Sequence, residues 1–288
     1  MGEVDQLAAA AAELSIEAAD GYELHYTHLP AANRRRSAIV AIHGAQSHAG
    51  WYGRSCERLA QAGHDVYFFD RRGSGLNQVD RGHCPGGNQL IDDVVRAVKH
   101  VRREVGDVPV FLLSISWGGK LALMTLKKNP DLVDGVMFLC PGWFAKVWPS
   151  MREKLAIGWS YLFWPHRRLP IPLGDPALFT GSDQWQRFIR EDPLSLRLAS
   201  AKFLMTSWFW DGEIRDAGSA ITIPALLMLG GEDRIIKNER TRTFFEAFAS
   251  RDKQVIHYPE AHHTLEFEPD PDRFVDDLLG WISEHLRR

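Results

Sequence analysis

Ser116 lies where a buried strand is expected to turn into a helix, within the stretch VPVFLLSISWGGKLALM (residues 108–124). Residues 108–113 are apolar without alternation, which predicts a strand covered on both faces. The apolar residues after Gly119 recur with the spacing of a helix. A sharp turn between a strand and a helix pushes a serine hydroxyl out at the end of a sheet, where it can act as a nucleophile. Ser116 is therefore the candidate nucleophile.

A serine hydroxyl needs a histidine to take its proton and a carboxylate to orient that histidine. The segment LLMLGGED ends with Glu232 and Asp233. The segment VIHYPEAHH ends with His262 and His263. Each pair follows a strand-like run, and such ends converge at one edge of a parallel sheet. The order serine, acid, histidine along the chain is the order expected for an α/β-hydrolase.

Ester hydrolysis also needs backbone N–H groups that stabilise the negative charge developing on the carbonyl oxygen. One such group is expected from Trp117, the residue after the candidate nucleophile. The loop HGAQSHAGWYG, which begins at His43, follows another strand-like run and offers the second N–H, which we assign to Ala45. The two N–H groups would together form an oxyanion hole.

Strand-like and helix-like segments alternate along most of the chain, which predicts an α/β fold with a mostly parallel central sheet and helices on both faces. Two strands around Asp20–Gly21 predict an initial hairpin with a two-residue turn. The predicted strands are residues 14–18, 22–29, 37–44, 65–70, 108–116, 135–140, 223–233 and 253–260, and the predicted helices are 50–63, 88–106, the segment after Gly119, 238–250 and 271–286.

The alternation stops at Pro141. Residues 142–215 are aromatic, punctuated by prolines and helix-like, and they hold seven of the ten tryptophans. We expect this segment to be a helical cap inserted into the α/β core, which then comprises residues 1–141 and 216–288. Its rings can pack on the core, as aromatic side chains usually do, or line a channel for an acyl chain.

Four segments resemble the monoacylglycerol lipase and lysophospholipase group of α/β-hydrolases, which are serine aminopeptidase-like. HGAQSHAGWYGRS is similar to the loop H-G-x-x-x-H-S-x-x-Y of that group. FFDRRGSGLNQVDRGHCPG is similar to its segment D-x-R-G-x-G-x-S followed by R-G-H, and GGEDRII and PEAHHTLEFE resemble its acid and histidine loops. The similarity runs from about residue 20 to the C-terminus and omits the cap.

The resemblance implies which acid and which histidine take part. The family spacing G-x-x-D selects Asp233 over Glu232, and the family pattern A-x-H selects His263 over His262. With Ser116 these residues imply a serine ester hydrolase that works through an acyl-enzyme.

The chain departs from the family pattern at two positions. Ser114 replaces the first glycine of G-x-S-x-G, and Asn77 stands where the family tends to have serine. Serine is small enough for the crowded turn, so we expect Ser114 to adjust activity rather than abolish it. We expect a structural role in the loop after the fourth strand for Asp70, Arg71, Arg72, Gly73 and Gly75.

The implied substrate is a carboxylic ester with an apolar acyl chain, such as a monoacylglycerol or a lysophospholipid. We also expect transient contact between the cap and a membrane or micelle surface. The acidic residues of the cap are dispersed among arginines, whereas a peptidase that binds free N-termini would need clustered acidic residues there. Three alternatives remain open: a hydrolase of small esters, a peptidase, and a non-catalytic binding protein with the α/β-hydrolase fold.

Composition argues against several other classes of protein. A net charge of −3 gives no reason to expect nucleic acid as a partner. Cys56, Cys84 and Cys140 lie far apart and lack the spacing of a zinc site, which fits a reduced compartment. The N-terminus carries acids where a signal peptide needs basic residues, and no stretch approaches ~18 consecutive apolar residues. We therefore expect a cytoplasmic enzyme that needs no metal and no cofactor.

Overall fold

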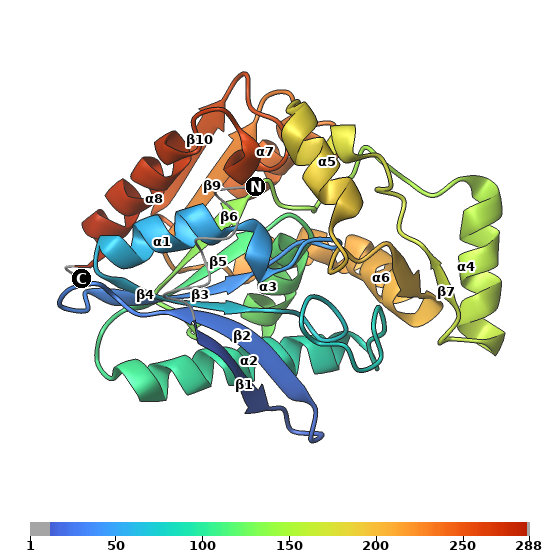
Figure 1. Cartoon of the computed structure of the whole chain (residues 1–288), viewed down its shortest axis with the longest axis horizontal. Coiled ribbons are helices and arrows are strands. Elements are labelled where there is room, and N and C mark those ends of the chain that lie inside the picture. The colour runs from blue at the N-terminus through green and yellow to red at the C-terminus, as the bar shows by residue number, and fades with distance from the viewer. Residues whose placement is uncertain (1–11, 287–288) are drawn as a thin grey trace.

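The computed structural model describes residues 12–286 and shows a central eight-stranded sheet with helices on both faces (Figure 1). The strand order is β1-β2-β4-β3-β5-β6-β9-β10, with β1 and β2 antiparallel to their neighbours and the other pairs parallel. The predicted fold class is confirmed. The strands are β1 (Ala12–Glu17), β2 (Glu23–Leu29), β3 (Ser37–Ile42), β4 (His64–Phe69), β5 (Val110–Ile115), β6 (Gly135–Leu139), β9 (Ala225–Gly230) and β10 (Lys253–Tyr258).

Helices cover both faces of this sheet. The core helices are α1 (Gly53–Gln61), α2 (Gly87–Val105), α3 (Trp117–Lys128), α7 (Asn238–Glu246) and α8 (Asp272–His285), with short 3-10 helices at η2 (Ala49–Trp51) and η5 (Leu265–Phe267). Helices α1 and α8 pack together on one face, and α2 and α3 pack together on the other. Every residue of β3, β4, β5, β6 and β9 is buried, which explains why these strands read as unbroken apolar runs.

The chain between β6 and β9 (residues 140–224), called the insert below, leaves the sheet and crosses over its end. It contains α4 (Met151–Phe163), β7 (Arg168–Pro170), η3 (Pro176–Leu178), α5 (Asp183–Glu191), β8 (Leu198–Ser200), α6 (Ala201–Ala217) and η4 (Gly218–Ala220). Helix α6 packs on α3 of the core and on α4. The antiparallel pair β7–β8 was not predicted, because strands of three residues are too short to show a periodic pattern.

The initial hairpin forms, but the prediction of a two-residue turn was wrong. The N–H of Ala18 donates to the carbonyl of Tyr22 (2.7 Å), which leaves three residues in the loop. Gly21 closes the loop in the left-handed region, at φ +78°, as a three-residue hairpin loop requires. Asp20 at the tip then accepts two hydrogen bonds of 3.0 Å from Arg72, so the hairpin supports the loop after β4.

None of the helices within residues 12–286 has both the length and the apolar character that a membrane span requires. The acidic N-terminal residues that argued against a signal peptide precede the described part of the chain.

Candidate active site

Ser116 sits on the turn that joins β5 to α3. Its backbone is in the left-handed region (φ 53°), and its N–H donates to the carbonyl of Leu139 (2.9 Å). Two residues later a side chain has no room, because a Cβ on Gly118 would lie 2.7 Å from the carbonyl oxygen of His43 and 2.8 Å from that of Ile42. The turn therefore holds Ser116 in a conformation that non-glycine residues rarely adopt, as nucleophile elbows do.

Ser114 fits the position where the sequence pattern expects glycine. Its side chain is fully buried in β5, and its hydroxyl donates to the carbonyl of Met137 on the neighbouring strand β6 (3.1 Å). This hydrogen bond offsets the cost of removing the hydroxyl from water, so the structure accommodates the departure locally.

The side chains of Ser116, His263 and Asp233 form a continuous hydrogen-bonded chain. His263 Nε2 lies 2.8 Å from Ser116 Oγ, and His263 Nδ1 lies 2.6 Å from Asp233 Oδ2. The other carboxylate oxygen of Asp233 accepts from the N–H groups of Ile235 (2.7 Å) and Ile236 (3.0 Å). These two bonds fix the carboxylate, which in turn orients the imidazole so that Nε2 faces the hydroxyl.

The alternative acid, Glu232, and the alternative base, His262, do not take part in this hydrogen-bonded chain. Glu232 is exposed, next to the buried Asp233. His262 is 22% exposed in its side chain, and its Nδ1 lies 3.1 Å from Glu268 Oε1, the oxygen that also accepts from the His262 N–H. The structure thus brings His263, rather than His262, to Ser116.

Two free backbone N–H groups flank Ser116. Among the described residues, neither the N–H of Ala45 nor that of Trp117 donates a hydrogen bond, whereas the N–H of Gly44 is taken by Ser47 Oγ (3.0 Å). Ala45 and Trp117 both line the cavity that contains Ser116. Trp117 is the first residue of α3, where the helix dipole adds to the attraction for negative charge.

His43 holds the peptide that carries the Ala45 N–H. The N–H of Arg71 donates to His43 Nε2 (2.9 Å), so the imidazole proton is on Nδ1, which donates to the carbonyl of Gly44 (2.8 Å). Burial holds the pKa of His43 well below its usual value, so the ring is neutral. Because the Gly44 carbonyl and the Ala45 N–H belong to one peptide group, this bond fixes the direction of the N–H. Sequence reasoning missed this role of His43, although the adjacent Gly44 marks the turn.

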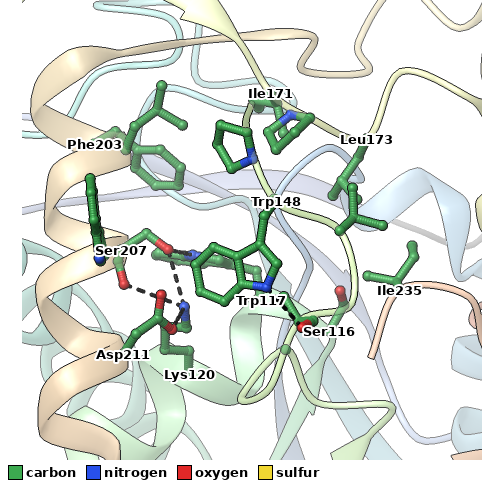
Figure 2. Close-up of a pocket in the computed structure, with 18 of the residues that line it drawn as sticks. Ser116, Trp117, Lys120, Trp148, Ile171, Leu173, Phe203, Ser207, Asp211 and Ile235 are labelled. Atoms are coloured by element: carbon green, nitrogen blue, oxygen red, sulfur yellow. Dashed lines mark hydrogen bonds and ion pairs between the residues drawn. The ribbon is translucent and has the colours of Figure 1, made fainter. Parts of the chain in front are cut away.

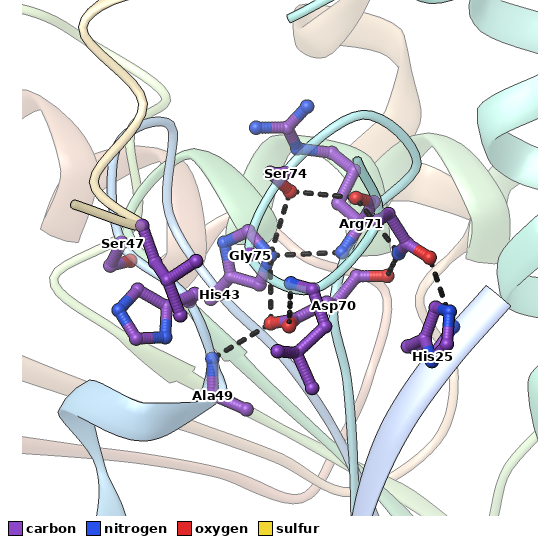
Figure 3. A network of polar contacts seen from close by, with 12 residues as sticks. His25, His43, Ser47, Ala49, Asp70, Arg71, Ser74 and Gly75 are labelled. Carbon is purple, nitrogen blue, oxygen red and sulfur yellow. Dashed lines mark hydrogen bonds and ion pairs between the residues drawn. The ribbon is translucent and has the colours of Figure 1, made fainter. Parts of the chain in front are cut away.

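The loop after β4 is held by Asp70 (Figure 3) and by Asn77. Asp70 accepts from the N–H groups of Ala49 and Leu76, both at 2.8 Å. Asn77 accepts from the N–H of His25 (3.0 Å) and donates to the Asp70 carbonyl (2.7 Å). The side-chain amide of Asn77 thus joins β2 to this loop through both its oxygen and its nitrogen, which gives a local reason for asparagine at position 77.

A cavity of about 390 Å³ adjoins Ser116 between the core and the insert (Figure 2). Most of its lining is apolar and comes from both parts, including Trp148, Ile171, Leu173, Phe203 and Ile235. One wall is polar and carries Lys120, Ser207 and Asp211. Sequence reasoning missed these three residues as a group, although a lysine within the apolar first half of the helix after Ser116 was a visible signal.

Cys140 lies behind the candidate acid and histidine. Its sulfur and ligand atoms of Asp233 and His263 lie within 4.8 Å of one another, the one such cluster of potential metal ligands within the described residues. Burial, and then the charge of Asp233, hold the pKa of this thiol well above its usual value. The other two side chains are hydrogen-bonded to each other, so the cluster fits the hydrogen-bonded chain better than a metal.

Known proteins resemble this chain over most of its length. Mouse monoglyceride lipase is 25% identical over 275 residues, which cover 93% of this chain and 89% of the mouse protein. A monoacylglycerol lipase of Mycolicibacterium smegmatis is 24% identical, covering 87% of this chain and 89% of the relative. The crystal structure of Paleococcus ferrophilus monoacylglycerol lipase superposes with a TM-score of 0.82 at 26% identity, covering 91% of this chain and 99% of that one.

A family model described as serine aminopeptidase, S33, matches residues 33–270. The match includes the turn at Ser116, both oxyanion candidates and the loops of Asp233 and His263. Because it spans most of the chain, and because the fold and the similar structures agree with it, the protein belongs to this serine aminopeptidase S33 family of α/β-hydrolase enzymes.

Proposed function

We propose that the protein hydrolyses carboxylic esters of lipid type, such as monoacylglycerols or lysophospholipids, with Ser116, His263 and Asp233 as the catalytic triad. The observation that carries this proposal is the hydrogen-bonded chain from Ser116 Oγ through His263 to Asp233, at 2.8 and 2.6 Å. The relatives named monoglyceride lipase and monoacylglycerol lipase support the class of substrate.

The geometry suits a two-step reaction. Ser116 Oγ attacks the ester carbonyl while His263 Nε2 takes the hydroxyl proton, and Asp233 stabilises the imidazolium that forms. The N–H groups of Ala45 and Trp117 stabilise the tetrahedral oxyanion. Collapse of this intermediate breaks the bond to the alcohol, which leaves with the proton from His263. Water then attacks the acyl-enzyme with His263 as base, and the acid is released.

The cavity supports an apolar acyl group. Its volume of about 390 Å³ and its largely apolar lining suit a chain rather than an acetyl group alone. A peptidase that binds a free N-terminus needs an uncompensated acid near the nucleophile, but Asp211 in the cavity is paired with Lys120. The cavity therefore favours an ester with an apolar chain over a peptide.

We propose that the insert acts as a cap that takes its substrate from a lipid surface. Helix α4 lies at the outer margin of the molecule (Figure 1). It lines the cavity through Lys154 and Ile157, and its exposed large apolar residues are Met151, Leu155, Trp159, Leu162 and Phe163. An exposed apolar face beside the mouth of a substrate cavity suits contact with a lipid surface.

Labelling with a fluorophosphonate tests the triad, because only an activated hydroxyl reacts with this phosphorus centre at neutral pH. We expect the label on Ser116, and we expect Ser116→Ala to lose it while Ser114→Ala, the matched control, keeps it. A label on Ser114, or undiminished labelling of Ser116→Ala, would contradict the proposal.

A series of p-nitrophenyl esters from acetate to dodecanoate, kept below their micelle concentrations, tests the class of substrate. Each buried CH₂ contributes roughly 0.8 kcal/mol, so kcat/KM should rise about tenfold for every two added carbons until the cavity is full. A maximum at acetate would instead identify a hydrolase of small esters.

Sedimentation with phospholipid vesicles tests the role of α4. We expect the double variant Leu155→Gln/Leu162→Gln to sediment less than the wild type, with hydrolysis of p-nitrophenyl acetate unchanged, because both side chains are exposed. A wild-type protein that does not sediment would exclude contact with a lipid surface.

A further inference from the structure

The cavity beside Ser116 contains a polar patch formed by the buried Lys120 of α3 and by the half-buried Ser207 and Asp211 of α6 (Figure 2). Lys120 Nζ donates to Asp211 Oδ1 (2.5 Å), to Ser207 Oγ (3.2 Å) and to the Ser207 carbonyl (3.3 Å). The indole N–H of Trp117 also donates to Ser207 Oγ (2.9 Å). The patch interrupts a lining that is otherwise largely apolar.

The hydrogen-bond donors and acceptors of the patch are not all paired with one another. The three hydrogens of the Lys120 ammonium match three acceptors, so this lysine has nothing left to offer a ligand. Asp211 Oδ2 has no hydrogen-bond partner among the described residues, and the Asp211 side chain is 23% exposed. Ser207 Oγ accepts two hydrogen bonds, while its own hydrogen has no acceptor within residues 12–286. One acceptor and one donor therefore remain.

One free acceptor beside one free donor is the complement of a hydroxyl group, which both donates and accepts. The opposite charges of Lys120 and Asp211 are in contact, so the patch has no net charge that would favour an ammonium or a carboxylate. A saturated chain lying over the patch would cover Asp211 Oδ2 and Ser207 Oγ without pairing them, which costs free energy.

The position of the patch indicates how far the substrate hydroxyl lies from the ester carbonyl. Lys120 lies four residues after Ser116, which is one turn or about 6 Å along α3. This spacing suits a group on the same substrate molecule as the carbonyl attacked by Ser116, a few carbons away from that carbonyl. The apolar residues of the cavity then bind the rest of the chain.

We propose that Ser207 and Asp211, held by Lys120, form a specificity subsite for a neutral hydroxyl group on the acyl chain of the ester. This subsite rests on the proposed ester hydrolysis and names its substrate more closely: a hydroxyacyl ester. Asp211 Oδ2 accepts from the substrate hydroxyl, and the Ser207 hydroxyl donates to it.

Methyl octanoate and a set of methyl hydroxyoctanoates, with the hydroxyl moved along the chain, test the subsite when the released acid is titrated at constant pH. We expect one positional isomer to exceed methyl octanoate in kcat/KM by about tenfold or more. We expect esters with an ammonium or a carboxylate at that carbon to be poorer than the hydroxy ester. Equal rates for all isomers, or a preference for either charged chain, would overturn the subsite.

The double variant Lys120→Met/Asp211→Leu removes the patch without leaving a buried unpaired charge. It should lose the preference for the hydroxy ester and gain activity on methyl octanoate. Ile171→Val, a matched control in the apolar part of the cavity, should change both rates by the same factor. A double variant that keeps the wild-type preference would contradict the proposal.

Labelling of Ser116 by a fluorophosphonate distinguishes loss of the subsite from loss of ester hydrolysis. A labelled wild type that hydrolyses methyl octanoate and all isomers equally leaves ester hydrolysis standing and removes the subsite. A wild type that is not labelled and hydrolyses none of these esters overturns both.

Discussion

Arg71 donates a hydrogen bond of 3.0 Å from its guanidinium to the carbonyl oxygen of Ala45. The same guanidinium lies 5.0 Å from the ring centroid of Trp117, so one cation contacts both residues proposed to stabilise the oxyanion. Arg71 is buried, its Nε has no partner among the described residues, and no ion pair joins it to a described carboxylate. Burial lowers its pKa to about 10, which leaves it charged at neutral pH.

Arg71→Met should lower kcat by roughly 10- to 100-fold with a smaller change in KM, because a buried positive charge near the two proposed N–H donors stabilises the anionic transition state more than the ground state. Steady-state kinetics measure this, and Arg71→Lys, which keeps the charge, should lose less. A boronic acid forms an anionic tetrahedral adduct with the serine, so Arg71→Met should bind it more weakly than the wild type does. Unchanged affinity for the boronic acid would contradict an electrostatic role of Arg71.

His263→Ala should lower kcat by roughly four to six orders of magnitude, as loss of a triad base does. His262→Ala is the matched control and should stay within about threefold of the wild type, because His262 bonds Glu268 rather than Ser116. Kinetics on one p-nitrophenyl ester compare the two variants. The reverse ranking would make His262 the base.

Asp233→Asn should be nearly as severe as His263→Ala, because an amide cannot stabilise the imidazolium and favours the wrong tautomer. Glu232→Gln serves as its control, since Glu232 is exposed beside the site. If Asp233→Asn keeps wild-type kcat, another carboxylate supports the histidine.

Ser114→Gly should lower the free energy of unfolding by about 1–2 kcal/mol and leave kcat/KM within about twofold. The variant loses the hydrogen bond to Met137 and places a flexible residue in a buried strand. Chemical denaturation measures the first quantity. A large rise in kcat/KM would show instead that serine at this position restrains the nucleophile.

Glu266 should make stability depend on pH. Burial raises its pKa from 4.5 to about 7 in the folded protein, so the folded state holds the proton more tightly than the unfolded state. The free energy of unfolding should therefore fall as the pH rises from about 4.5 to about 7 and then level off. Glu266→Gln should flatten this dependence and gain roughly 3 kcal/mol above pH 7, measured by denaturation at several pH values. Identical pH profiles for the two proteins would show that Glu266 ionises freely.

The sheet could be predicted because five of its strands are buried on both faces and appear as unbroken apolar runs. Ser116, Asp233 and His263 could be proposed for a related reason, since each follows such a strand and strand ends meet at one edge of the sheet. The choice of Asp233 over Glu232 depended on family spacing, because neighbouring residues give no periodic signal of which one is buried.

The polar wall of the cavity could not be predicted, because Lys120 and Asp211 lie far apart in the chain and no local pattern pairs them. The role of His43 depends on a tautomer that only its neighbours in space determine. The pair β7–β8 likewise joins segments that lie far apart in the chain, whereas the length of the first hairpin loop depends on the local bond from Ala18 to Tyr22.

The bonds from α3 to α6 limit how this enzyme can be recombined with its relatives. A chimera whose insert lacks an acid in place of Asp211 and a hydroxyl in place of Ser207 would leave Lys120 buried without an ion-pair partner, and the indole of Trp117 without an acceptor. An unpaired buried ammonium costs several kcal/mol, so such an exchange should reduce folding unless position 120 is changed together with the insert. These bonds thus couple position 120 of the core to positions 207 and 211 of the insert, so the two sides of the cavity must change together.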